Sequence, residues 1–133
     1  MPPPDPTPLP LPAAVLRHTL ADGSAHFDLL LARRAADDPD ARIAATWRCE
    51  ADPSTLAPGA SCACTAIHDH RALYLALAQA RELDGGRGRV EPVARGAWTP
   101  DGAGFLVRWH AGAATRLRID AGRLHRAPDA ATA

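Results

Sequence analysis

The sequence predicts a mainly β protein, a compact antiparallel β-barrel with one or two short helices. Its 133 residues suit a single domain. Between residues 13 and 127, short runs of strand-forming residues alternate with turns that contain glycine, a succession typical of barrels and sandwiches. A domain of this length buries enough surface to fold without a disulfide or a structural metal.

The expected barrel domain occupies residues 13–127 and has a tail at each end. Residues 1–12 are rich in proline, which fixes φ and removes hydrogen-bond donors, so we expect a disordered arm there. Residues 128–133 should form a second tail. Residues 51–61 are expected to be a loop, and residues 72–80 either a helical turn or a strand, with their alanine and leucine content favouring helix weakly. The expected strands are residues 13–20, 25–32, 42–50, 89–94, 104–110, 115–119 and 122–126.

Charge and cysteine content narrow the class of protein. The formal net charge is zero, but residues 1–70 carry 5 arginines against 9 acidic residues, and residues 71–133 carry 10 against 6. The basic half can attract a polyanion, because arginine binds phosphate with two hydrogen bonds, although a solvated mixed surface accounts for it equally well. The 3 cysteines, in a spacing that is not standard for zinc, favour reduced thiols in a cytoplasmic protein. No apolar run approaches the ~20 residues of a membrane span, and the N-terminus does not resemble a signal peptide.

A histidine and an aspartate beside a turn form the first candidate site. Residues two apart on a strand share a face, so His26 and Asp28 point the same way, and this pair suits a divalent ion such as manganese or zinc. His18, on the preceding strand, joins them only if the turn around Asp22 has an odd number of residues or a bulge. A three-residue loop is allowed because Gly23 can adopt the left-handed conformation that it requires. Alternatively, the two histidines are unrelated polar residues of a hairpin.

A second candidate site follows at residues 68–74, HDHRALY. The imidazole of His70, the guanidinium of Arg71 and the phenol of Tyr74 can hold phosphate oxygens through charge-assisted hydrogen bonds. The alternative is a polar loop that leads into a helix, with Asp69 as the helix cap.

The order of these motifs resembles the 3′-phosphoesterase domain of bacterial DNA ligase D and its small stand-alone relatives. The likeness covers most of residues 13–126, although each motif is short. The matching elements are His18, His26-Phe27-Asp28, Ala45-Thr46-Trp47, Asp69-His70-Arg71-Ala72-Leu73-Tyr74, the glycine-rich Gly85-Gly86-Arg87-Gly88-Arg89-Val90 and Gly96-Ala97-Trp98.

The resemblance implies a β-barrel with a polar, metal-binding cavity and a manganese-dependent activity on the 3′ ends of nucleic acids during end joining. His18, His26 and Asp28 would hold the divalent metal, with manganese as the first choice and zinc as the second. His70 would contact the scissile phosphate, with Tyr74 in support. A monomer is expected, acting on nucleic-acid 3′ ends, with a ligase or another repair protein as a further partner.

The sequence departs from the family mainly on the phosphate side of the expected site. Leu30 stands where the catalytic members carry an arginine, and His68 stands where a glutamate is common. Losing a preorganised donor weakens transition-state stabilisation. Arg17, Arg71 and Arg87 are the candidates to compensate. Two hypotheses therefore remain: a metal-dependent phosphoesterase, or a catalytically weak or inactive barrel that binds DNA ends or a repair partner.

Overall fold

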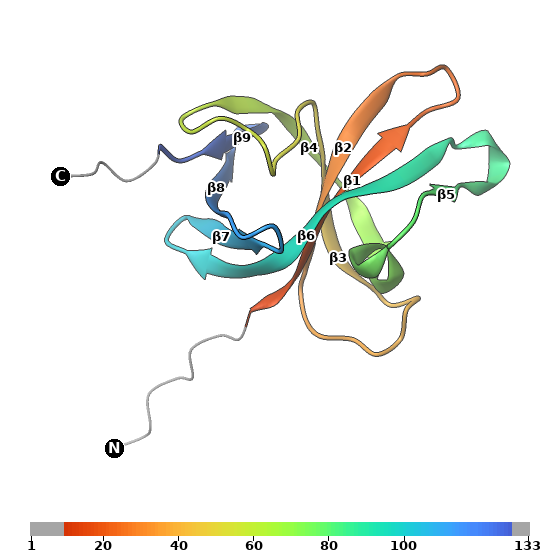
Figure 1. Cartoon of the computed structure of the whole chain (residues 1–133), viewed down its shortest axis with the longest axis horizontal. Coiled ribbons are helices and arrows are strands. Elements are labelled where there is room, and N and C mark those ends of the chain that lie inside the picture. The colour runs from red at the N-terminus through yellow and green to blue at the C-terminus, as the bar shows by residue number, and fades with distance from the viewer. Residues whose placement is uncertain (1–9, 129–133) are drawn as a thin grey trace.

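The computed structural model describes residues 10–128 and shows a closed antiparallel β-barrel (Figure 1). Eight strands close in the order β1-β2-β3-β4-β9-β8-β7-β6, with β6 pairing back onto β1, and β5 pairs with β6 outside the ring. Helical structure in this part of the chain is limited to two short 3-10 turns, and no helix there is long and apolar enough to cross a membrane. The strands are β1 (Leu11–Thr19), β2 (Ala25–Ala32), β3 (Arg42–Cys49), β4 (Ser61–Arg71), β5 (Arg81–Glu82), β6 (Arg89–Asp101), β7 (Gly104–Trp109), β8 (Ala114–Asp120) and β9 (Arg123–Arg126), and the turns are η1 (Ala72–Ala76) and η2 (Asp84–Gly86).

The predicted fold class is confirmed, but several element boundaries differ from the prediction. β1 begins at Leu11, within the expected arm; residues 1–9 of that arm and 129–133 of the expected C-terminal tail lie outside the described residues. β4 was not expected as a strand. β6 continues well past residue 94, to Asp101. Where β6 pairs with β1, Val93 is an extra residue between the pairs Val15–Ala94 and Leu16–Pro92, a bulge of the kind that lets a strand contain a proline, which cannot donate to a regular ladder.

The barrel interior is an apolar core built from the inward faces of seven of its strands. Alternate residues of β1 and β2, such as Val15, Leu29 and Leu31, point into it and pack against the far wall. Trp109 is buried there and donates a 3.0 Å hydrogen bond from Nε1 to Oγ1 of Thr115. The three cysteines also lie in this core as buried side chains without a disulfide between them: Cys49, Cys62 and Cys64.

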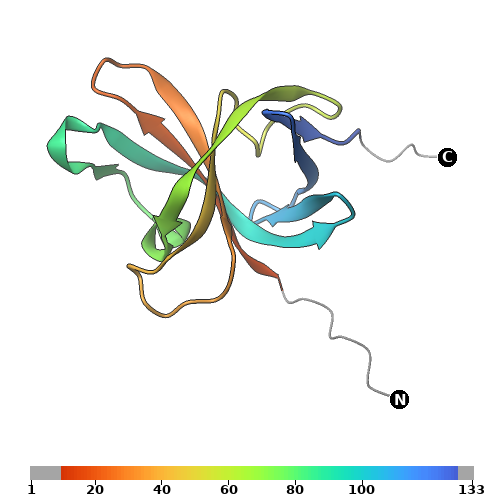
Figure 2. The same ribbon diagram turned by 180° about the vertical axis from the view of Figure 1, so that it is seen from behind.

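A second apolar cluster lies on the outer face of β1, β2 and β3. It contains Leu16, Leu30 and Ile43 and is covered by Leu75 of η1. In both views η1 and β5 lie beside these strands, on the side away from β7, β8 and β9 (Figures 1 and 2). β2 is therefore buried on both faces over its second half, which explains its continuous apolar run. The candidate site occupies the same outer face further toward the β1–β2 turn: His18 follows Leu16 by two residues, and Asp28 precedes Leu30 by two.

Candidate metal centre

The β1–β2 hairpin brings the first two histidines together. His18 is directly opposite His26 in the register. The turn is the three-residue form: the Leu20 N–H donates to the Ser24 carbonyl at 2.8 Å, and the Gly23 N–H donates to the Leu20 carbonyl at 2.9 Å. Gly23 has φ +87°, the left-handed conformation that this loop needs. The expectation that an odd loop places both histidines on one face is confirmed.

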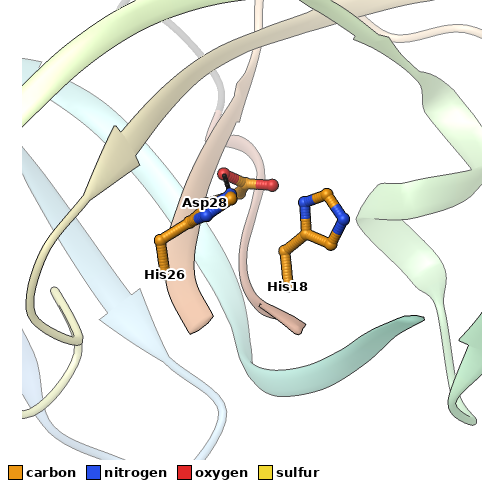
Figure 3. A group of neighbouring side chains, drawn as sticks. All are labelled: His18, His26 and Asp28. Carbon is orange, nitrogen blue, oxygen red and sulfur yellow. Dashed lines mark ion pairs between the residues drawn. The ribbon is translucent and has the colours of Figure 1, made fainter. Parts of the chain in front are cut away.

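His18, His26 and Asp28 form a group that could hold a metal ion. Each offers one ligand atom, and these atoms lie within 4.8 Å of one another. Figure 3 shows the three side chains converging from β1 and β2. The two imidazole rings meet edge to face, with centroids 4.8 Å apart. The predicted geometry of this group is confirmed; which ion it binds stays a prediction.

Two buried polar atoms at the centre of the group have no hydrogen-bond partner within residues 10–128. Nε2 of His26 lies 3.3 Å from Oδ1 of Asp28, but the alignment makes no hydrogen bond, and neither atom finds another partner. Asp28 is 2% exposed, and burial raises its pKa to about 6. Burial also lowers the pKa of His26 to about 4, aided by the charges of Arg48 and His18. A cation between the carboxylate and the imidazole would satisfy both orphaned atoms, so the residues fit a divalent metal.

The third member, His18, is oriented by a backbone carbonyl. Its Nε2 lies 2.7 Å from the carbonyl oxygen of Arg87. A carbonyl only accepts, so Nε2 carries a proton, and in the neutral tautomer that this hydrogen bond favours the lone pair is on Nδ1. This outer hydrogen bond is the usual device by which a metal-binding histidine is held in one tautomer. The close approach depends on Gly88, where a Cβ would lie 2.1 Å from the carbonyl oxygen of Thr19.

A bulge in β4 places His70 in the same site. Thr46 of β3 pairs with Ile67, whereas Ala44 pairs with His70, so β4 has one extra residue between these two pairs. Residues three apart on a regular strand point to opposite faces. The extra residue reverses this alternation, so both Ile67 and His70 face the cleft. Nδ1 of His70 donates to the His68 carbonyl at 3.2 Å, which leaves the lone pair on Nε2, 3.9 Å from Oδ2 of Asp28. Burial lowers the pKa of His70.

Arg71 and Tyr74 line the same cleft, but Arg71 has local partners. Its guanidinium donates to Oδ1 of Asp40 at 3.0 Å and to the Tyr74 hydroxyl at 3.4 Å. The Tyr74 ring lies 5.8 Å from that of His70. Asp69 does not cap a helix, as the alternative interpretation expected: its carboxylate binds Arg33 at 2.8 Å, and η1 has no side-chain cap. The structure thus brings all six predicted site residues together, while their roles stay predictions.

The cleft has a volume of about 430 Å³ and a strongly basic lining. It lies on the outside of the barrel wall, not in the apolar interior. Asp28 is the one acidic residue in this lining, which consists of His18, Leu20, His26, Asp28, Arg42, Arg48, Ile67, His68, His70, Arg71, Tyr74, Leu83, Arg87 and Val90. Such a lining favours an anionic ligand that has an apolar part.

The arginines that line the cleft are not all those that the sequence analysis singled out. Arg42 and Arg48 of β3 line the cleft and were not singled out in the sequence, although the alternation of β3 puts Arg48 on the face opposite Trp47. Of the three proposed substitutes, Arg71 and Arg87 reach the cleft, whereas Arg17 is exposed and takes no part in its lining. Leu30 is fully buried beneath η1 and does not line the cleft. An arginine there would not reach this cleft without displacing the apolar cluster.

The chain matches no family model, and it matches no curated protein. The likeness to the 3′-phosphoesterase domain therefore remains a resemblance of short motifs in order. The chemistry of the cleft follows from the residues that line it.

Proposed function

We propose that this protein is a metal-dependent phosphoesterase that acts on the 3′ ends of nucleic acids, on a 3′-phosphate or a 3′-ribonucleotide. One observation carries the proposal: a buried carboxylate oxygen of Asp28 and the buried Nε2 of the half-buried His26 face each other without hydrogen-bond partners among the described residues, in a cleft lined by arginines and histidines. A cation would satisfy the two unpaired atoms, and the arginines and histidines of the lining favour an anionic ligand. Phosphate ester chemistry needs both in one place.

His18, His26 and Asp28 would hold the metal, and the mixed nitrogen and oxygen ligands suit manganese, with zinc as the second choice. When bound, a divalent ion supplies charge neutralisation for the phosphate and a nucleophile near neutral pH. The Arg87 carbonyl keeps His18 in the tautomer that offers Nδ1. Because burial lowers the pKa of His26, that imidazole is neutral at neutral pH, and a second proton competes little with the metal for its lone pair.

His70 would act beside the metal ligands as a proton acceptor. Its Nδ1 proton is engaged by the His68 carbonyl, and its low pKa keeps Nε2 unprotonated on the cleft side at neutral pH. A water or a phosphate hydroxyl next to Nε2 can donate to it. Tyr74 packs edge to face against the His70 ring and limits its movement. Arg71 fixes the Tyr74 hydroxyl and adds positive charge at the same wall.

The function is tested with a primer-template that carries a 3′-phosphate, in the presence of manganese. We expect release of phosphate from the parent protein, loss of turnover for His26→Ala, and a large loss for His70→Ala. His110→Ala is the matched control, because His110 is exposed at a distant turn and lies outside the cleft lining. If the parent shows no turnover on 3′-phosphate or 3′-ribonucleotide ends with manganese or zinc, the enzyme proposal fails.

The same assay separates the enzyme from the alternative, a barrel that binds DNA ends or a repair partner such as a ligase. A binding module would retain a labelled 3′-phosphate end in a manganese-dependent way without releasing phosphate. In either case the site of action that we propose is the cytoplasm, on a nucleic-acid end.

A further inference from the structure

We propose that Arg48 binds the phosphate of the ligand in the cleft. Strand β2 has Leu30 at the position where the resembled family carries an arginine, and Arg48 of strand β3 supplies the guanidinium in its place. This inference rests on the proposed function and names the residue that orients its substrate. Arg48 is directly opposite Asp28 in the β2–β3 register and lines the same cleft. A phosphate in the cleft would therefore lie between the metal-binding group and this side chain.

The register places Arg48 beside the metal-binding group. Residues directly opposite each other on an antiparallel pair have Cβ atoms roughly 5 Å apart and project from the same face. The charge of Arg48 lowers the pKa values of both His26 and Asp28, as a neighbouring cation must. It nevertheless makes no ion pair with Asp28 within 4.0 Å, so Asp28 does not occupy the guanidinium.

The other arginines of the cleft have hydrogen-bond partners, whereas Arg48 has none in the part of the chain that the structure describes. Arg71 binds Asp40 and Tyr74, Arg87 donates from Nε to the Asp84 carbonyl at 2.8 Å, and Arg42 donates to the Asp69 carbonyl at 3.4 Å. Among residues 10–128, no hydrogen bond or ion pair involves the Arg48 guanidinium, which is exposed at the cleft. Its full set of donors is available for the two parallel hydrogen bonds that phosphate accepts.

Arg48 is also the residue that complements His70. His70 presents the lone pair of Nε2 to the cleft, since its Nδ1 donates to the His68 carbonyl, so in the proposed function it accepts a proton and does not supply the positive charge that attracts phosphate. A permanently charged guanidinium supplies that attraction at any pH in the physiological range. The two residues then have different roles: Arg48 binds and orients the phosphate, and His70 accepts a proton.

The test measures binding of inorganic phosphate and turnover for Arg48→Leu and Arg48→Lys. Arg17→Leu is the control, since Arg17 is exposed on strand β1 but lies outside the cleft lining. Phosphate binding to the manganese-loaded protein is read from the broadening of the phosphate 31P resonance. Thermal unfolding of each variant confirms that it is folded.

We expect Arg48→Leu to weaken phosphate binding about 10- to 100-fold, the loss expected for a hydrogen bond to a charged group. Arg48→Lys should recover part of the loss, because lysine keeps the charge but not the paired donors. Manganese affinity should stay the same or rise in Arg48→Leu, since a repelling charge is removed; a merely structural role would lower it. kcat/KM on a 3′-phosphate end should fall about 100- to 1,000-fold.

Each outcome decides either this inference or the proposed function. Unchanged phosphate binding in Arg48→Leu, an equal loss in Arg17→Leu, or no phosphate binding by the parent overturns the role of Arg48. If the parent hydrolyses 3′ ends while Arg48→Leu is unaffected, the proposed function stands and this inference falls. If the parent binds phosphate through Arg48 but hydrolyses no 3′ end, the inference stands and the enzyme proposal falls.

Discussion

Replacing Asp28 by asparagine should stabilise the metal-free protein at neutral and alkaline pH. The buried carboxyl has its pKa raised from 3.8 to about 6 by desolvation, so the folded protein favours the protonated form. This favourable contribution is present below about pH 4 and is lost as the pH rises through 6. Above that pH, the ionised carboxylate costs the folded state on the order of 3 kcal/mol, since each pKa unit corresponds to about 1.4 kcal/mol.

Asparagine has nearly the same shape and removes the charge. Its amide can also donate a hydrogen bond to Nε2 of His26, which is 3.3 Å from Oδ1 of Asp28 and has no partner. We therefore expect Asp28→Asn to gain about 2–3 kcal/mol of unfolding free energy at pH 8 and almost nothing at pH 4. For a domain of this size, the gain raises Tm by on the order of 10 °C.

The assay is thermal and urea unfolding of the metal-free protein from pH 4 to pH 8, with Asp37→Asn as a control at an exposed position. Protonation of His26, whose pKa is lowered on folding, reduces stability as the pH falls below about 6.5 and affects both proteins. The difference between Asp28→Asn and the parent is therefore the informative quantity. Adding manganese at about 100 times its Kd should stabilise the parent by about 2.7 kcal/mol and leave Asp28→Asn unchanged. A pH-independent difference, or a less stable Asp28→Asn at pH 8, would refute the claim that Asp28 is strained in the absence of metal.

Three further perturbations probe other parts of the site. Manganese affinity should fall steeply below about pH 6, because a proton competes for Asp28; an isothermal titration series that shows constant affinity from pH 8 to pH 5 would contradict this. Gly88→Ala should weaken manganese binding, since its Cβ would clash with the backbone of β1 and move the Arg87 carbonyl away from His18; metal affinity equal to that of the parent would show that this carbonyl is dispensable. Leu30→Arg should lower the unfolding free energy by about 3–5 kcal/mol without raising turnover, because it buries an unpaired charge under η1; a stable and faster variant would show that position 30 has access to the substrate.

The first strands of the chain could be predicted from the sequence because the local residue preferences there match the observed fold. The β1–β2 hairpin has a glycine where a left-handed residue is required, and the alternation of His26 and Asp28 follows directly from strand geometry. β4 was missed because it has small residues, cysteines and clustered histidines in place of the branched residues typical of strands. Its bulge, which turns His70 into the cleft, is a pairing event between strands and has no signal in the local sequence.

Arg48 was missed for a related reason. Arg48 and Asp28 are far apart in the sequence. Only the β2–β3 register shows that they are directly opposite each other on neighbouring strands. Leu30 illustrates the converse: the resemblance placed this position beside the phosphate, while in this chain an apolar cluster and η1 cover it. Short motifs indicate which chemistry is present, but the register decides which side chains share a cavity.

The two faces of β2 suggest how this small barrel maintains an unfavourable buried carboxylate. Leu29 and Leu31 are buried in the barrel core, and Leu30 is buried in the outer cluster, so the strand is fixed from both sides immediately after Asp28. Burying a large apolar side chain contributes about 1.5–3 kcal/mol, and three of them exceed the cost of one ionised carboxylate. The strand therefore stays in register with or without a metal, and His26 and Asp28 keep their convergence. Preorganisation of this kind lets a metal bind without a folding step, which is why removal of metal should change the stability of this protein but not its fold.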